Sequence, residues 1–155
     1  MKNLKGGCSC RKVRYRLLAE PMRVHCCHCT NCQNQTGSAF VLNAIIETGA
    51  TRKLRGELEV VPVRRERGTH DVYRCRACKV AVWSDYGRRA GLRFVRVGTL
   101  DEPGALRPDI HIYTRAKAAW LRLPKGTPAF REYYDVKKVW PEKSLRRLQA
   151  ALEVR

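Results

Sequence analysis

Apolar and polar residues alternate over several short segments of the chain, as they do in half-buried β-strands. Val13, Tyr15 and Leu17 alternate with arginines, which gives the two-residue period of a strand with one face against a core. Residues 39–46 form an almost continuous apolar run, AFVLNAII, which predicts a strand buried on both faces. Further strand-like segments lie at 58–63, 71–74, 80–83, 92–97 and 110–113.

Turn-forming residues separate these segments, and an amphipathic helix follows them. Glycine or proline falls between many of the predicted strands, at Gly49, Gly56, Gly68, Gly87, Gly91, Pro103, Gly104 and Pro108. A short helical turn is expected at 116–121. Pro141 suits the first turn of a helix, and Leu145, Leu148 and Leu152 share one face, so we predict a helix over about 141–153. Without an internal repeat or linker, residues 1–155 are predicted to form one mainly-β domain with a C-terminal helix.

Length and charge exclude several classes of protein. A chain of 155 residues fits one ordinary domain, which buries roughly two-thirds of its unfolded surface and needs no disulfide staples. No apolar run reaches the ~18 residues of a membrane span. Residues 1–7 are basic without an apolar stretch, so they do not resemble a secretion signal, and we expect a cytoplasmic protein. The net charge is +18, from 32 Lys and Arg against 14 Asp and Glu.

Eight cysteines change the picture, because their spacing is typical of metal sites. They fall into three groups: Cys8 and Cys10; Cys75 and Cys78; and Cys26 followed by Cys27, Cys29 and Cys32. In a reducing compartment such a count indicates metal binding more often than disulfides. Cysteines two or three residues apart are strained as disulfides, but they suit two thiolates about 3.7 Å apart on a tetrahedral ion. The spacing therefore predicts zinc.

Seven of the eight thiols divide into a closed site and an open site. The first two pairs would fill all four positions of one zinc ion, whereas the third group offers three thiols and leaves one position free. His25 or His28 could occupy that fourth position instead. His28 sits between two ligands, so in an extended segment it should point away from the ion. We interpret Cys26 as a buried or spare thiol, and His70 and His111 as ordinary strand residues.

Four sequence blocks carry a family resemblance. They are GGCSCRKVRY at 6–15, CHCTNC at 27–32 with TGSAF at 36–40, CRAC at 75–78, and PDIHI at 108–112 with Trp120. These blocks resemble the glutathione-dependent formaldehyde-activating (GFA) family, which includes centromere protein V. The resemblance covers residues 5 to 130 or so, and it is specific because the order and spacing of all seven cysteines agree.

The resemblance implies a β-tent fold of antiparallel strands with two zinc ions per chain, the second one partly occupied. By the family pattern, Cys8, Cys10, Cys75 and Cys78 would hold a structural zinc. Cys27, Cys29 and Cys32 would hold the zinc linked to activity. The reaction of the family joins glutathione and formaldehyde into S-hydroxymethylglutathione, which is a carbon–sulfur lyase reaction in reverse.

The chain departs from the family pattern at three positions. Arg11 and Lys79 stand where members usually have glycine after each structural pair, and Cys26 is an additional thiol. If Arg11 or Lys79 requires a positive φ, its side chain costs about a kcal/mol. These departures concern local turn geometry rather than the ligands.

The chemistry of an open three-thiolate site agrees with a thiol substrate. Three thiolates leave Zn²⁺ with a net charge of −1, so it acidifies water less than a three-histidine site but still binds a thiolate, the nucleophilic form. Addition of that thiolate to a small aldehyde gives a hemithioacetal. His25 and His28 are the nearest candidates for proton transfer. Between residues 1 and 46, seven Lys and Arg accompany a single acid, Glu20, and would attract the carboxylates of glutathione.

The basic charge also supports an alternative function, a zinc-stabilised module that binds nucleic acid or another polyanion without catalysis. Lys and Arg are spread along the chain, however, with seven in 1–50, thirteen in 51–100 and twelve in 101–155. Arg146 and Arg147 are the nearest approach to a patch. We therefore favour the enzyme over the binding module. The sequence carries no signal of oligomeric state.

Overall fold

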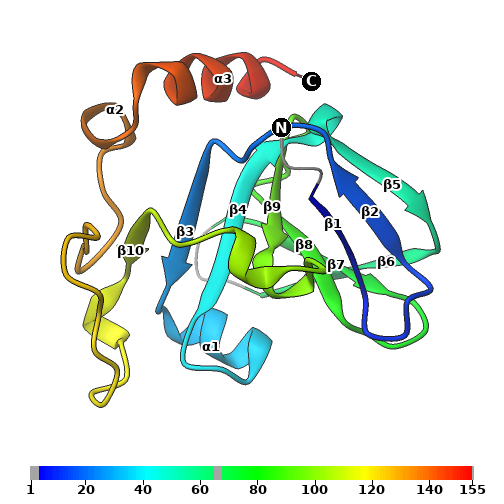
Figure 1. Cartoon of the computed structure of the whole chain (residues 1–155), viewed down its shortest axis with the longest axis horizontal. Helices are drawn as coiled ribbons and strands as arrows, with labels where there is room; N and C mark the ends of the chain where they lie inside the picture. The colour runs from blue at the N-terminus through cyan, green and yellow to red at the C-terminus, as the bar shows by residue number, and fades with distance from the viewer. Residues whose placement is uncertain (1–3, 65–67, 155) are drawn as a thin grey trace.

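Two β-sheets form the body of the protein (Figure 1). The computed structural model describes residues 4–64 and 68–154. Its strands are β1 (Lys5–Gly7), β2 (Arg14–Leu17), β3 (Arg23–Cys27), β4 (Val41–Glu47), β5 (Thr51–Arg55), β6 (Leu58–Pro62), β7 (His70–Cys75), β8 (Ala81–Tyr86), β9 (Leu92–Arg96) and β10 (Ile110–Ile112). The smaller sheet has the order β1-β2-β5, and the larger sheet has the order β10-β3-β4-β9-β8-β7-β6.

The named strands within the described ranges pair antiparallel, except for β10 with β3. β10 joins the edge of the larger sheet parallel to β3, with Ile110 beside His25 and Ile112 beside Cys27. The parallel pair is reached by the long connection from β3 through the rest of the sheet, as parallel pairing requires. The predicted mainly-β fold with a C-terminal helix is confirmed, and the larger sheet is mixed rather than purely antiparallel.

The helices are short and lie at the ends of the strands. They are α1 (Thr30–Thr36), α2 (Val136–Val139) and α3 (Glu142–Leu152), with 3-10 turns η1 (Thr48–Ala50), η2 (Val97–Thr99), η3 (Pro103–Ala105) and η4 (Thr114–Ala116). Figure 1 shows α1 and α3 at opposite ends of β3 and β4. A turn closed by a hydrogen bond from the Leu121 N–H to the Ala118 carbonyl lies within the range 116–121 where one was expected, directly after η4. None of the described helices is long and apolar enough to cross a membrane.

The larger sheet separates two hydrophobic clusters. Ala44 and Ile46 of β4 pack with Tyr15 of the smaller sheet, whereas the intervening Ile45 packs with Trp140 from the C-terminal segment. Successive residues of a strand point to opposite faces, so β4 is buried on both sides. The apolar run at 39–46 predicted this burial.

Helix α3 is fixed to the sheet by packing and by an ion pair. Pro141 is the N-cap residue rather than part of the first turn. Ala151 is buried, whereas Leu152, which the heptad-like spacing placed on the core face, is 49% exposed. Gly91 lies so close that a Cβ there would come within 1.8 Å of the Ala151 carbonyl oxygen. Arg147 also donates two hydrogen bonds, both 2.6 Å, to the Glu47 carboxylate of β4.

Candidate metal centres

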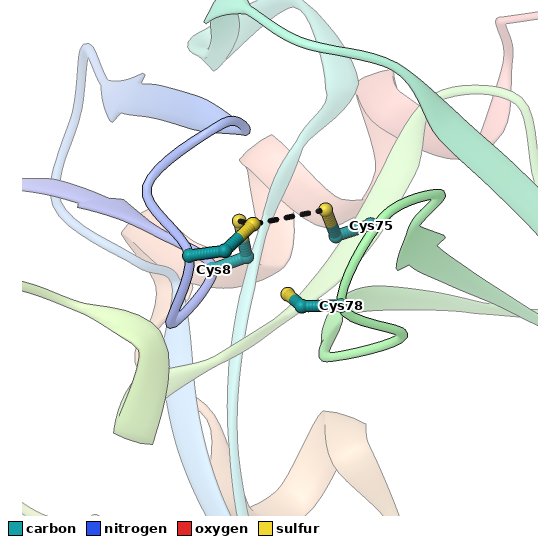
Figure 2. Close-up of side chains that lie close together, drawn as sticks. Cys8, Cys75 and Cys78 are labelled. Carbon is teal, nitrogen blue, oxygen red and sulfur yellow. Dashed lines mark hydrogen bonds between the residues drawn. The ribbon is translucent and has the colours of Figure 1, made fainter.

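Two hairpin turns bring four cysteines together. Cys8 and Cys10 follow β1, Cys75 ends β7, and Cys78 lies in the turn between β7 and β8. The sulfurs of Cys8 and Cys10 are 3.4 Å apart, those of Cys10 and Cys75 are 3.8 Å apart, and all four lie within 4.8 Å of one another. Figure 2 shows the sulfurs of Cys8, Cys75 and Cys78 facing the same space from the two turns. These spacings match those of thiolates around a tetrahedral zinc ion.

Both turns place a residue with positive φ directly after the second cysteine. Arg11 donates its backbone N–H to the Cys8 carbonyl at 2.9 Å, and Lys79 donates to the Cys75 carbonyl at 2.8 Å. Arg11 has φ 60° and Lys79 has φ 62°, so both occupy the left-handed region. A side chain costs about 1–2 kcal/mol there. Each turn therefore keeps a strained residue directly after its second cysteine, where the sequence predicted a cost if positive φ was needed.

The electrostatics of the four thiols differ. Burial raises the pKa of Cys78, but hydrogen bonds from the backbone of Cys10 and Val80 outweigh it and lower the pKa to about 6. A backbone hydrogen bond at Lys12 lowers the pKa of Cys10, yet the neighbouring sulfurs raise it to about 11. Four thiolates this close would repel one another, so without a cation some of the four thiols keep their protons. A bound cation would allow all four to be thiolates.

Three further cysteines meet where β3 leads into α1. Cys27 ends β3, Cys29 is the N-cap of α1, and Cys32 lies in its first turn. Cys29 Sγ accepts a hydrogen bond from the Cys32 backbone at 3.3 Å, which aims both side chains to one side of the helix start. The sulfurs of Cys27 and Cys32 are 3.4 Å apart, and all three sulfurs lie within 4.8 Å of one another.

This three-cysteine group opens into a cavity of about 290 Å³. The wall combines aromatic rings with a few polar groups, and only one of its residues is a permanent cation, Arg89. Beside the three cysteines it is lined by Tyr86, Phe94, Tyr113, Tyr133 and Ile112, and by His25, Asn31, Asn43 and Arg89. Such a mostly apolar wall with a few polar groups is typical of small-molecule sites.

His25 lies on this wall, and His28 does not. Burial lowers the pKa of His25 to about 4, so its imidazole is neutral at pH 7. Its Nε2 is 2.6 Å from the Tyr134 hydroxyl, which in turn accepts a hydrogen bond from Trp140 Nε1 at 2.5 Å. Because the indole can only donate, the Tyr134 proton is available for His25 Nε2. The ring of His28 instead contacts His111 and Cys26.

A buried arginine near the three cysteines was not predicted from the sequence. Arg96 is 5% exposed and donates hydrogen bonds to Asn43 Oδ1 and, at 2.7 Å, to Ser84 Oγ. The hydrogen bond with Cys27 and the charge of Arg96 lower the pKa of Cys32, but the bond with Cys29 and burial raise it to about 11. An arginine at the end of a strand is usually exposed to solvent, so the sequence gave no sign that Arg96 would be buried.

The profile of one protein family matches most of the chain. Residues 3–116 match the profile of a family described as glutathione-dependent formaldehyde-activating enzyme, and these residues include all eight cysteines. The chain belongs to this family. The GFA match ends before Trp120, although the resemblance in the sequence reached about residue 130. The cysteine clusters are compatible with zinc, the metal of the GFA family.

Other comparisons add the fold alone. No curated protein matches the chain. A solved structure of a Rhodobacter sphaeroides protein is similar at 20% identity, over 67% of this chain and 91% of that chain, with a TM-score of 0.50. At this identity the similarity shows a shared fold.

The structure also places the residues that the sequence set aside. His70 lies in β7, 3.1 Å from Ser84 Oγ and stacked on Tyr86, in agreement with its interpretation as a strand residue. Cys26 is a buried thiol and His111 is a strand residue of β10, in agreement with their interpretation from the sequence. They meet His28 in a third group of metal-ligating side chains, all three of them buried. Chain spacing gave no sign of this group, because His111 comes from a distant strand.

Proposed function

We propose that the protein is a zinc-dependent enzyme of carbon–sulfur lyase type, which joins a small thiol such as glutathione to a small aldehyde such as formaldehyde and reverses that step. One observation carries this proposal. Three cysteine sulfurs converge at the wall of a cavity of about 290 Å³, so a fourth ligand can reach the same ion from the cavity. A site with three protein ligands and one open position is the arrangement of catalytic zinc.

We assign two zinc ions per chain. Cys8, Cys10, Cys75 and Cys78 would hold the structural ion, and Cys27, Cys29 and Cys32 would hold the second ion, with lower occupancy because one position is open. When bound at the second site, zinc supplies the positive charge that favours the thiolate form of a substrate thiol. The donor set fits, since sulfur ligands at these separations suit zinc.

The cavity favours a small aldehyde. Its volume is at the low end of ligand pockets, which measure about 300–1,000 Å³. The thiol end of a peptide and a one-carbon aldehyde would fill it, and Arg89 on the wall offers a positive charge to a substrate carboxylate. The surrounding basic surface would increase the local concentration of an anionic thiol.

The proposed step forms one bond and moves two protons. The thiol releases its proton, its sulfur attacks the carbonyl carbon, and the π electrons of the carbonyl move to oxygen, which then takes a proton. Tyr134 donates to His25 Nε2 in this scheme, so Nδ1 carries the hydrogen of the neutral ring. We propose that His25 stabilises the developing oxyanion by donating a hydrogen bond rather than by acting as a base.

Calorimetric titration of zinc-loaded protein tests the open position. Glutathione is expected to bind at least tenfold or so more tightly than S-methylglutathione, because the thioether cannot become a thiolate. Binding should weaken with added salt, which screens the substrate carboxylates, and in acid, where protons compete for sulfur. Equal affinity for the two ligands would contradict the proposal. Cys29→Ser serves as the matched protein, in which the preference for the thiol should disappear.

A reducing compartment suits this chemistry, and we propose the cytoplasm. None of the eight cysteines, all of which lie in the described ranges 4–64 and 68–154, forms a disulfide. Glutathione is kept reduced in the same compartment, so protein and substrate thiols would remain available together.

A second function, polyanion binding, is favoured by one exposed residue. Trp120 is 73% exposed and lies beside Lys117, Arg122 and Lys125. A tryptophan face next to cations can stack on nucleic-acid bases. The other two tryptophans, Trp83 and Trp140, are buried, so quenching of fluorescence by a single-stranded oligonucleotide would report on Trp120. Binding that is absent at low salt would exclude this function, and Trp120→Ala should remove the quenching.

A further inference from the structure

A third group of ligating side chains lies apart from the seven cysteines described above. It consists of Cys26 in β3, His28 in the link between β3 and α1, and His111 in β10. The parallel register places His111 directly beside Cys26. Cys26 and Cys27 are successive strand residues and point to opposite faces of the sheet, so β3 separates this group from the three-cysteine group.

The three donor atoms have the separations of metal ligands. Cys26 Sγ is 3.5 Å from His28 Nε2, and His28 Nε2 is 3.0 Å from His111 Nδ1. All three atoms lie within 4.8 Å of one another. Ligands at about 2.0 Å for nitrogen and about 2.3 Å for sulfur lie some 3.3–3.6 Å apart around one ion. The sulfur–nitrogen pair meets this test, and the two nitrogens, at 3.0 Å, would move apart by about 0.3 Å around an ion.

The short contact between the two imidazoles can hold either a shared proton or a cation. The outer nitrogens, His28 Nδ1 and His111 Nε2, are buried without a hydrogen-bond partner among the described residues. The tautomer of a histidine is set by the partner of its other nitrogen, and no donor here forces either outer nitrogen to be the bare one. Both rings can therefore carry their hydrogen outward and present both inner lone pairs, which a cation between them would stabilise.

We propose that Cys26, His28 and His111 form a third metal site, which takes one soft monovalent ion of the Cu(I) class. One thiolate and one monovalent cation give a neutral site. A divalent ion would leave a net positive charge in a buried place, where no carboxylate belongs to the group. Thiolate together with imidazole suits copper, and His28 is fully buried, which favours a three-coordinate ion without water.

X-ray absorption on the full-length protein tests the site directly. Both cysteine clusters are first loaded with zinc, and one equivalent of Cu(I) is then supplied anaerobically from its bicinchoninate complex. We expect a copper shell of one sulfur and two nitrogens, with no zinc released. A shell of sulfur alone, accompanied by release of zinc, would place the copper in a cysteine cluster and overturn the proposal. This measurement needs no variant.

Two substitutions test the ligands individually. Cys26→Ser and His111→Gln should each weaken Cu(I) binding by more than about tenfold in competition with bicinchoninate. His70→Gln is the matched control, because His70 is an equally buried strand histidine outside the group. Zinc content and circular dichroism report whether each variant folds. Cu(I) affinity unchanged by both substitutions, in folded protein, would refute the site.

Discussion

Arg96 is a cation buried among neutral partners. Its side chain donates hydrogen bonds to the Asn43 side-chain oxygen and the Ser84 hydroxyl, and it takes part in none of the ion pairs of the described residues. Burying a charge without a counter-charge is costly. Three thiolates with a zinc ion would carry a net charge of −1 nearby, and the field of Arg96 already acts on Cys32. Arg96 is therefore suited to be the counter-charge of the open metal site.

Arg96→Gln should weaken zinc binding at the three-cysteine group by roughly tenfold, equivalent to about 1–2 kcal/mol for one charge at moderate distance. The four-cysteine group should keep its zinc. Arg93→Gln is the control, because Arg93 lies on the same strand but over the rings of Trp83 and Tyr73. Competition with a chromogenic chelator measures both affinities. An equal loss in the two variants would contradict the counter-charge role.

A second prediction at this scale concerns the strained turn residue Arg11. Arg11→Gly should be more stable than Lys12→Gly by about 1 kcal/mol, because glycine relieves the left-handed strain at Arg11. Both side chains are exposed, and Lys12 is not among the residues with positive φ, so glycine at Lys12 only adds freedom to the unfolded chain. Urea unfolding of the zinc-loaded proteins gives the two free energies. Equal values would mean that the turn stores no strain.

At the scale of elements, α3 depends on its ion pair with β4. Burial alone would raise the pKa of Glu47, but hydrogen bonds from Arg147 outweigh it, and the pKa is lowered. A carboxylate with a depressed pKa stabilises the folded state above its unfolded pKa and loses this contribution as the pH falls through the folded value. The attachment of α3 should therefore weaken in acid.

Arg147→Gln should lower the unfolding free energy by about 1 kcal/mol at neutral pH, since both side chains are only 26% exposed and the contact is bidentate. The difference from the native chain should begin to shrink as the pH falls through the pKa of an unfolded glutamate, about 4.3, and should vanish only below the depressed pKa of Glu47 in the folded protein. Arg146→Gln is the control, because its pair with Glu142 is 71% and 80% exposed and should contribute little. Denaturant titrations at several pH values provide the comparison. A difference that persists at low pH would rule out the ion pair as its source.

Local pattern predicted some elements and not others, for physical reasons. The alternation at Val13–Leu17 and the apolar run of β4 record burial directly, so these strands could be predicted. β5 is mostly exposed and basic, and it is a strand because β2 pairs with it. α1 has no apolar stripe, and it is defined by its caps, Cys29 and Gly37. The cysteine groups followed from spacing, whereas Arg96 and the aromatic wall come from strands that only the tertiary fold brings near.

For the whole molecule, the two cysteine clusters belong to different cores. Cys8 and Cys75 are part of the cluster beneath the smaller sheet, and Cys27 and Cys32 are part of the cluster beneath α3. The four-cysteine group joins two hairpins that are 65 residues apart between Cys10 and Cys75, whereas the three-cysteine group is local. The four-cysteine group therefore connects distant parts of the chain, whereas the three-cysteine group forms part of the wall of the cavity.

Cys75→Ser should lose several kcal/mol of stability and fail to hold zinc, because binding of a structural zinc is part of the folding free energy. Cys29→Ser should remain folded with one zinc fewer. In the native protein, a chelator should remove the zinc of the open site first. Elemental analysis and circular dichroism of the three proteins check each outcome. Unfolding of both variants to the same extent would show that the three-cysteine group is also structural.

The separation of the two hairpins also matters while the chain is being made. Cys10 leaves the ribosome 65 residues ahead of Cys75, and Cys8 leaves it earlier still. At roughly 5–20 residues per second, this interval lasts about 3 to 13 seconds. During that time the first two thiols form half of a site, too few to hold a zinc ion firmly and open to oxidation. If the proposed zinc binds, the newborn chain would need a reducing environment until Cys75 and Cys78 complete the site.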